Sequence, residues 1–408
     1  MEKAIQSHRR ALTINPNSYS TRNQLAALLR FEGKIPEAEQ LYKEVLQLNP
    51  GNAQACYNLS QLRSHKDCDN LIDLFKRCSQ LTATDPISQI QIHFALGKLY
   101  EDLENFSMAM ENYSIGAELK GQQREYDVSR DQKFMNSAIS FFDALEIQQP
   151  SRDESQRKPL FVLGLPRTGT TVVERILASH PQVVSGDELN ALPMALLEAG
   201  GMSMAAGWEA LDNMWISKVQ AENFPRIGER YFELASNYVG DAPIFVDKLP
   251  YNFLYCGFIL HALPNARIVH VRRNPFDAAV SNFKMLFNRG YEYSYTWRDI
   301  AKFIHAYMQQ MESWEKLFPG QILVLDYEKL VENQEKETRR LLEFSGLEWS
   351  EDCLNFHRNK SATRTASASQ VREPIHSRAI GFWRNYEPML TELIEAFSEL
   401  GIYPDKRY

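Results

Sequence analysis

"GLPRTGTTVVER", residues 164–175, stands between an apolar run, "PLFVLGL", and a helical pattern, and it decides the fold. Gly164 and Gly169 have the spacing of the pattern Gly-x4-Gly-Lys-Ser/Thr, but Thr170 occupies the lysine position and Thr171 follows it. The N–H groups at the end of such a loop point out of the first turn of a helix, where orphan donors and the helix dipole favour an anion. The stretch therefore predicts a strand, loop and helix that bind a phosphate group without the usual lysine.

Three further β-rich runs alternate with longer helical segments: "PIFVDKL" (243–249), "ARIVHVRR" (266–273) and "QILVLDY" (321–327). Strands that alternate with helices form a parallel sheet with helices on both faces. Ligands of such sheets bind beyond the carboxyl ends of the strands. We therefore expect residues 158–408 to form an α/β domain of the P-loop type, with its site at that edge of the sheet.

The first 121 residues contain a helical repeat. Asn15-Pro16 recurs 34 residues later as Asn49-Pro50, the period of a tetratricopeptide (TPR) helix pair. The packing positions of that repeat hold Leu25, Ala26, Leu29, Ala38, Tyr42 and Val45. Residues 53–86 fit the template only in part, and before Pro16 only a second helix exists, so we expect the chain to begin inside a repeat. The repeat predicts an all-α domain over residues 1–121 that binds a partner protein or serves in packing and self-association, and both readings stay open.

Residues 122–157 have a different composition. Charged stretches flank one apolar helical piece, "MNSAISFFDAL". We interpret this segment as a helical connector between the repeat and the α/β domain.

Composition and charge exclude several functions. The 408 residues carry a net charge of −7, which argues against a general nucleic-acid binder, and no apolar run is long enough to span a membrane. The cysteines, five in number, are scattered and form no CxxC pair (Cys56, Cys68, Cys78, Cys256 and Cys353). They indicate reduced thiols and no zinc site. We expect a cytoplasmic protein without a metal, a membrane contact or a nucleic-acid partner.

Two motifs together resemble a known family. "PLFVLGLPRTGTTVVERILASHPQV" (159–183) is similar to the 5′-phosphosulfate loop of sulfotransferases, which transfer a sulfuryl group from 3′-phosphoadenosine 5′-phosphosulfate (PAPS) and release 3′,5′-adenosine bisphosphate (PAP). "RRNPFDAAVS" (272–281) resembles the second motif of that family. The resemblance implies the sulfotransferase fold and a reaction without a metal. It also assigns two sets of residues: Arg167, Thr168, Gly169, Thr170 and Thr171 to the phosphosulfate, and Arg273 and Ser281 to the 3′-phosphate.

Within this family the chain is most similar to tyrosylprotein sulfotransferases and their TPR-bearing bacterial relatives. "ASHPQVVSGDELNALP" (178–193) resembles the tract with the catalytic glutamate, which implies that Glu188 is the base; Asp187 beside it is the weaker candidate. A carboxylate suits the removal of a hydroxyl proton. "FVDKLPYNF" (245–253) places Lys248 where the family has a lysine that stabilises charge on the bridging oxygen.

The C-terminal segment "RTASASQVREPIHSRAIGFWRNY" (364–386) resembles the part of these enzymes that closes over the nucleotide. The resemblance places Ser367 at the sulfuryl group and adds donor contacts from Tyr327, Gln370, Val371, Arg372 and Arg378. Arg378 is expected at the 3′-phosphate and Tyr327 near the adenosine.

The chain also departs from the family. The Golgi enzymes bridge two cysteines where this chain has Ser185 and Val246, which favours a cytoplasmic, bacterial type and leaves protein tyrosine open as the acceptor. The segments expected to build the acceptor pocket, 197–208 and 286–297, suit a peptide, a carbohydrate or a phenol equally. His180 and His270 do not stand at the position of the base.

Two other functions fit parts of the sequence. One is a metal-dependent kinase or nucleotide triphosphatase, which the absent lysine and the pair Arg273 and Ser281 oppose. The other is a helical scaffold with an inactive α/β domain, which the complete set of loop, glutamate and lysine opposes.

Overall fold

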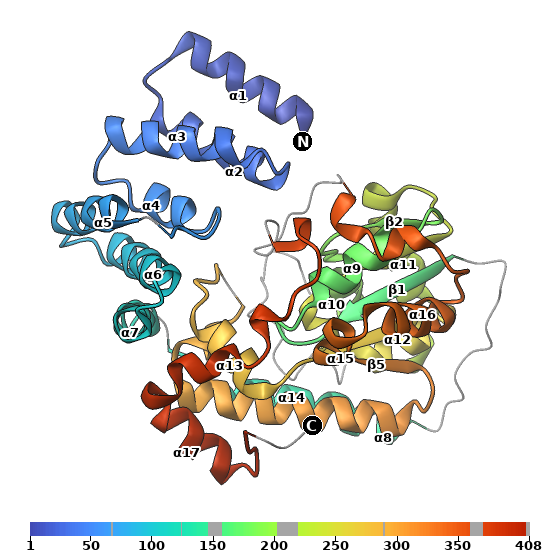
Figure 1. Cartoon of the computed structure of the whole chain (residues 1–408). Helices are drawn as coiled ribbons and strands as arrows, with labels where there is room; N and C mark the ends of the chain where they lie inside the picture. The colour runs from blue at the N-terminus through green and yellow to red at the C-terminus, as the bar shows by residue number, and fades with distance from the viewer. Residues whose placement is uncertain are drawn as a thin grey trace.

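The structure is a computed structural model of the chain, and it describes residues 1–66, 68–123, 125–145, 157–201, 219–288, 290–359 and 370–404, with only the backbone of Gln370. The N-terminal helices form an arc beside an α/β region (Figure 1). Of the helices in these ranges, none is both long enough and apolar enough to cross a membrane.

The sheet has five parallel strands in the order β2-β3-β1-β4-β5. Their bounds are β1 Lys158–Leu163, β2 Val183–Ser185, β3 Ile244–Asp247, β4 Arg267–Arg272 and β5 Ile322–Asp326. Strands β3, β4 and β5 lie within predicted β-rich runs, β1 begins one residue before its run, and β2 is an additional short edge strand. The predicted α/β fold with a parallel sheet is therefore confirmed.

Each face of the sheet has its own core because successive side chains of a strand point to opposite sides. Leu160 and Val162 of β1 belong to one core, which α9 (Thr170–Ala178), α15 (Tyr327–Glu332) and α16 (Gln334–Ser345) complete. Phe161 and Leu163 belong to the other core. The helices on that face are α10 (Ala191–Ala199), α11 (Phe224–Val239), α12 (Cys256–Ala262) and α14 (Trp297–Leu317).

The helical region consists of α1 to α7: α1 Glu2–Ile14, α2 Tyr19–Phe31, α3 Ile35–Leu48, α4 Ala53–Ser60, α5 Asp69–Leu81, α6 Pro86–Asp102 and α7 Phe106–Gly121. The residues predicted at the packing positions of the repeat are all buried (Leu25, Ala26, Leu29, Ala38, Tyr42 and Val45). The repeat pattern is weakest over residues 53–86, and there α4 has only eight residues. The all-helical region is thus confirmed, and its assignment to the TPR class stays a prediction.

The apolar helical piece of the predicted connector is α8 (Val128–Asp143). Its Phe142 lies against Phe258 of α12 and Trp314 of α14, with ring centroids 4.7 Å and 5.6 Å away. This helix therefore contributes to the core of the α/β region. The boundaries expected at residues 121 and 157 stay predictions.

The remaining helices are α13 (Pro275–Phe283) and α17 (Thr391–Glu399), with short 3₁₀ segments between residues 351 and 389. All five cysteines are buried and carry free thiols, as expected.

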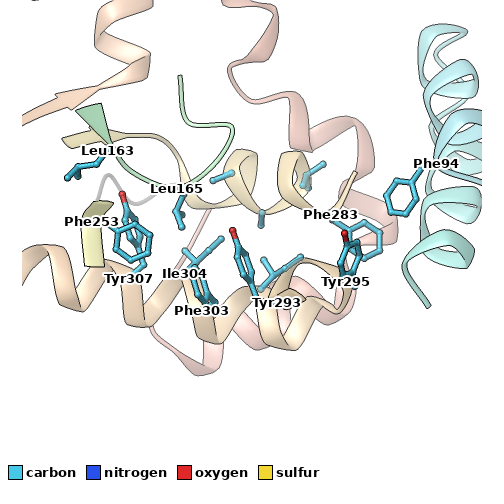
Figure 2. Packing of buried hydrophobic residues seen from close by; sticks show 14 of the residues in the cluster. Phe94, Leu163, Leu165, Phe253, Phe283, Tyr293, Tyr295, Phe303, Ile304 and Tyr307 are labelled. Atoms are coloured by element: carbon cyan, nitrogen blue, oxygen red, sulfur yellow. The ribbon is translucent and has the colours of Figure 1, made fainter. Parts of the chain in front are cut away.

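The two regions share one apolar core, which Figure 2 shows from close by. Phe94 of α6 faces Tyr295 of the α/β region, with ring centroids 6.3 Å apart. Tyr293 stacks on Phe303 of α14 at 3.8 Å. The helical region is therefore packed directly against the segment between α13 and α14.

Candidate active site

The predicted site residues follow the carboxyl ends of the strands. The loop 164–169 follows β1, Glu188 follows β2, Lys248 follows β3, Arg273 follows β4 and Tyr327 follows β5. Because the strands are parallel, these ends meet at one edge of the sheet. The topology therefore brings together residues from all five strands.

Two glycines permit the shape of the 164–169 loop. At Gly164, with φ +146°, an added Cβ would overlap the carbonyl oxygen of Val271, and at Gly169, with φ +101°, it would overlap the ring of Tyr327. Only glycine adopts such backbone angles without cost and allows so close an approach. The loop is thus packed between the ends of β4 and β5.

The N-terminus of α9 has donors without acceptors. The N–H groups of Val172 and Val173 bond to the carbonyl oxygen of Gly169, whereas those of Thr170 and Thr171 have no acceptor in the described part of the chain. No side chain caps this helix end either. Free N–H groups at a helix N-terminus bind anions, so the loop fits a phosphate or sulfate group.

Two arginines concentrate positive charge at this loop. Arg167 has φ +67°, and burial together with the nearby charge of Arg273 lowers its pKa to about 10, so it stays protonated at neutral pH. Arg273 has a side chain only 7% exposed and donates to the carbonyl oxygens of Arg167, at 2.8 Å, and of Ala379. Its Nε is buried without a partner among the described residues. Two neighbouring guanidinium groups repel each other, and an anion between them relieves that repulsion.

Three side chains support the loop, and two of them, Asn282 and Tyr293, are not among the predicted site residues. Asn282 of α13 donates to the carbonyl oxygen of Pro166 at 2.9 Å, and the hydroxyl of Tyr293 donates to Asn282 at 2.8 Å. The hydroxyl of Thr168 closes the turn by donating to the carbonyl oxygen of Leu165 at 2.7 Å. Asn282 directly follows Ser281 in the second motif, and that position was the only signal that could have pointed to it.

Glu188 and Lys248 form an ion pair between Nζ of the lysine and Oε1 of the glutamate. The lysine side chain is 1% exposed and the glutamate side chain 41% exposed. A buried ammonium group needs a partner, and Glu188 supplies it. The exposed part of the carboxylate remains accessible to another molecule, so the pair suits a general base beside a fixed cation.

Backbone hydrogen bonds fix these two residues next to each other. The N–H of Gly186 donates to the backbone carbonyl oxygen of Val246 at 2.8 Å, and the N–H of Lys248 donates to that of Asp187 at 3.0 Å. These bonds continue the pairing of β2 with β3 beyond the strands. Asp187 has φ +56°, a conformation that few residues other than glycine and asparagine adopt readily, and this turn precedes Glu188 directly.

A second carboxylate, that of Glu174, lies near Lys248 in addition to Glu188. Glu174 of α9 is buried and accepts a hydrogen bond of 2.5 Å from the hydroxyl of Ser185, which in turn accepts one from the N–H of Asp187. Burial raises the pKa of Glu174, and the charge of Lys248 acts against that rise. Nothing in the sequence pattern marks Glu174, because it lies inside a helix and not after a strand.

The ring of Tyr327 lies beside both the 164–169 loop and Arg273. Its ring touches the α-carbon side of Gly169, and the guanidinium carbon of Arg273 lies 5.3 Å from the ring centroid. Ser281, the other residue of the second motif, is on the last turn of α13 and is half-buried. Tyr327 and Arg273 therefore lie beside the loop, and the roles expected for Tyr327, Arg273 and Ser281 stay predictions.

The backbone of the C-terminal segment reaches the site, since Arg273 donates to the carbonyl oxygen of Ala379, but the two arginines expected at the donor have other partners. Val371 is buried, but the guanidinium group of Arg372 donates to the carbonyl oxygen of Phe31 in the helical region, at 3.1 Å. Arg378 is exposed and pairs with Glu373 at 2.5 Å. Ser367 and the side chain of Gln370 lie outside the described residues. The roles expected for these residues stay predictions.

The acidic residues that end β3 and β5 have partners of their own. Asp247 accepts hydrogen bonds from Tyr231 at 3.1 Å and from Asn252 at 3.3 Å. Asp326 pairs with Arg272 at 2.7 Å and with Lys329 at 2.5 Å. This arrangement gives no support to a Walker-B aspartate and thus none to a nucleotide triphosphatase.

Comparison with known proteins supports the same family. Residues 159–351 match the model of the sulfotransferase family. The chain is 31% identical over 389 residues to an uncharacterized protein of Aquifex aeolicus (strain VF5). This alignment covers 92% of this chain and 50% of the Aquifex protein. It is 28% identical over 237 residues to a putative protein-tyrosine sulfotransferase of Caenorhabditis briggsae, over 55% of this chain and 80% of the relative.

A third relative is protein-tyrosine sulfotransferase A of Caenorhabditis elegans, with 23% identity over 232 residues, 55% of this chain and 60% of the relative. The chain spans half the length of the Aquifex protein, at 50%. The matches to these two tyrosine sulfotransferases each cover 55% of this chain.

Proposed function

Residues 159–351 belong to the sulfotransferase family, and from this premise we propose that the chain transfers a sulfuryl group from PAPS to the hydroxyl group of an acceptor. The observation that carries the proposal is the position of the Glu188–Lys248 pair at the same sheet edge as the anion-binding loop. A base, a fixed cation and an anion site are what a transfer between two oxygen atoms requires.

The chain's own residues fit the donor. The free N–H groups of Thr170 and Thr171 and the charge of Arg167 would hold the 5′-phosphosulfate. Arg273 and Ser281 would hold the 3′-phosphate, since a guanidinium group forms charge-assisted hydrogen bonds to phosphate. The ring of Tyr327 would lie along the nucleoside.

PAPS supplies the activated sulfuryl group, and Glu188 and Lys248 would act on the two oxygens that exchange it. The acceptor oxygen forms a bond to sulfur, its proton passes to the carboxylate of Glu188, and the bond from sulfur to the 5′-phosphate oxygen breaks with its electron pair left on PAP. Lys248 would stabilise the charge that develops on that oxygen. Arg167 would act on the same group from the loop.

The acceptor we propose is a hydroxyl of the phenol type, with the tyrosine of a protein as one candidate. Relatives described as protein-tyrosine sulfotransferases support this choice, and so do the aromatic rings of Tyr251 and Tyr291, whose centroids lie 4.6 Å apart near the base. A carbohydrate acceptor is the alternative that the same chemistry allows.

The test is transfer of radioactive sulfate from labelled PAPS to a panel of tyrosine peptides, phenols and glycans, with and without a metal chelator. We expect labelled product with at least one class of acceptor and equal rates with the chelator. Calorimetric titration with PAP and with ATP should show a strong preference for PAP. Equal affinity for ATP, or transfer that stops with the chelator, would contradict the proposal.

A further inference from the structure

The helical region contacts the segment that joins α13 to α14, residues 284–288 and 290–296, which we call the α13–α14 loop. The hydroxyl of Tyr57 in α4 donates to the sulfur of Met285 at 3.8 Å, and the backbone of Leu286 lies beside the same hydroxyl. Phe94 of α6 packs edge-on against Tyr295. Figure 1 shows the arc of helices beside this loop, and Figure 2 shows Phe94 approaching Tyr295.

A buried ion pair fastens the start of this loop. Nζ of Lys284, the residue that ends α13, contacts Oε2 of Glu101 in α6, and the hydroxyl of Tyr386 donates to the same oxygen. The exposed fractions are 14% for the lysine side chain and 15% for the glutamate. Nζ also lies 4.4 Å from the ring centroid of Phe382. Burial opposes the charge of Glu101, but Lys284 and the hydrogen bond from Tyr386 bring its pKa below the ordinary value.

Tyr57 packs against the shared apolar core at its contact with the α13–α14 loop. Its side chain is half-buried. Burial raises the pKa of Tyr57 to about 12. Tyr57 is therefore held at the contact between the two regions.

The other side of the α13–α14 loop lies against the segment that follows Lys248. The ring of Tyr291 packs against Tyr251 at 4.6 Å, and Tyr251 stands three residues after Lys248. The same ring packs against Phe287 of the loop at 4.4 Å. Burial raises the pKa of Tyr291, and the negative charge of Glu188 adds to that rise. The loop therefore has one side on the helical region and one side on the segment that carries Lys248.

We propose that helices α4 and α6 form the outer wall of the acceptor site, with Tyr57 as a specificity-determining residue and the Glu101–Lys284 pair as the contact that positions the α13–α14 loop. The inference rests on the proposed sulfuryl transfer. The helical region then acts in acceptor selection within the same chain, and its contacts with the loop are part of the enzyme. A change at Tyr57 alters the fit of the acceptor and leaves the donor site as it is.

The first experiment tests, in the full chain, whether a change at Tyr57 affects acceptor binding and not donor binding. Tyr57→Phe and Tyr57→Ala are compared with the wild type for the KM and kcat of the best acceptor in the panel and for the affinity of PAP. Tyr19→Phe is the control, because Tyr19 is exposed and lies in α2, outside the two helices of the proposed wall. We expect KM to rise about tenfold in Tyr57→Ala and about threefold in Tyr57→Phe, with the affinity for PAP unchanged. An unchanged KM, or an equal loss of PAP affinity, would overturn the role of Tyr57.

The second experiment needs no activity. Amide hydrogen exchange is followed in peptides that cover residues 284–296 in the wild type and in Glu101→Gln, with the exposed Glu111→Gln as control. We expect faster exchange of this loop in Glu101→Gln only, at a denaturant-free condition where both variants are folded by circular dichroism. Unchanged exchange would show that the helical region does not position the loop. A wild type that transfers sulfate to no acceptor would overturn the proposed function and the role of Tyr57, while the exchange result still decides the positioning role.

Discussion

Two glutamate–lysine pairs join distant parts of this chain, and they differ in their surroundings. Glu188 and Lys248 are 60 residues apart and meet at the edge of the sheet, whereas Glu101 and Lys284 are 183 residues apart and meet between the two regions. In the first pair the carboxylate is 41% exposed; in the second pair both side chains are nearly covered, at 15% and 14%. A third group, Tyr386, completes the second pair.

The difference shows that residue types alone do not determine what such a pair does. An open carboxylate can accept a proton from a molecule that enters the site, and its fixed lysine can stabilise charge on a departing group. A closed pair can only hold two parts of the chain together, and removing one partner leaves an uncompensated buried charge. Burial and the third neighbour therefore separate a chemical role from a positioning role.

The largest effect is expected from Glu188→Gln, which keeps the shape of the side chain and removes the base. The kcat for sulfuryl transfer should fall about 10²- to 10⁴-fold, while PAP still binds. The free energy of unfolding should fall as well, because Lys248 is 1% exposed and loses its direct partner, although Glu174 remains near it. Initial rates with labelled PAPS measure kcat, and calorimetric titration measures the affinity for PAP.

Asp187→Asn is the matched control for that variant, because asparagine also adopts the positive φ of this position. It should keep most of the activity. If Asp187→Asn lost activity and Glu188→Gln kept it, the assignment of the base would move to Asp187.

The second prediction concerns the closed pair. Glu101→Gln leaves the ammonium group of Lys284 buried without a counter-charge, so the free energy of unfolding should fall by about 3–5 kcal/mol. Urea denaturation followed by tryptophan fluorescence measures it, with Glu111→Gln as the exposed control. A loss below about 1 kcal/mol would mean that the pair is as open to water as a surface ion pair.

A third prediction concerns Asp247, the residue before Lys248. Among the described residues, its carboxylate has hydrogen bonds from Tyr231 and Asn252 and no ion pair with a cation. Burial raises the pKa of Asp247 to about 8, with smaller opposing contributions from Tyr231, Asn252 and Lys248. The folded chain therefore holds a proton between about pH 4 and 8 that the unfolded chain has released. Stability from this group is present in full below the unfolded pKa and is lost as the pH rises towards 8, with a slope of at most about 1.4 kcal/mol per pH unit.

Asp247→Asn removes that titration and keeps the shape of the side chain. Unfolding curves at several pH values should show a flatter decline for the variant than for the wild type, with the remaining slope due in part to Glu174, whose pKa burial also raises. Parallel curves for the two proteins would show that Asp247 does not hold its proton in this range.

The sequence predicted those parts of the site that follow strands directly. Arg167, Lys248, Arg273 and Tyr327 each stand after a predicted strand, and parallel strands bring their carboxyl ends together whatever the details of packing. Glu188 was expected from the family resemblance alone. The edge strand β2 has only three residues, too few for a periodic pattern, so it was not predicted.

Contacts between the two regions leave no such signal. Tyr57 and Met285 are 228 residues apart, and neither position looks unusual within its own helix or loop. Arg372 illustrates the same limit: no local pattern indicates that its guanidinium group donates to the carbonyl oxygen of Phe31 in the helical region. Local patterns specify elements and their ends, and the packing between regions depends on surfaces that only the folded chain creates.

The smallest effect on the free energy of unfolding is expected from Tyr386, whose hydroxyl bonds to the Glu101–Lys284 pair. Tyr386→Phe removes the hydrogen bond to Glu101 and keeps the ring against Phe106, at 5.3 Å, and near Lys284. Because the acceptor is charged, the free energy of unfolding should fall by about 1.5–3 kcal/mol in the wild-type background. In Glu101→Gln the same change should cost clearly less, and the difference between the two losses measures the coupling. Equal losses in both backgrounds would show that the hydroxyl stabilises something other than the ion pair, and the contrast between the open and the closed pair would then rest on burial alone.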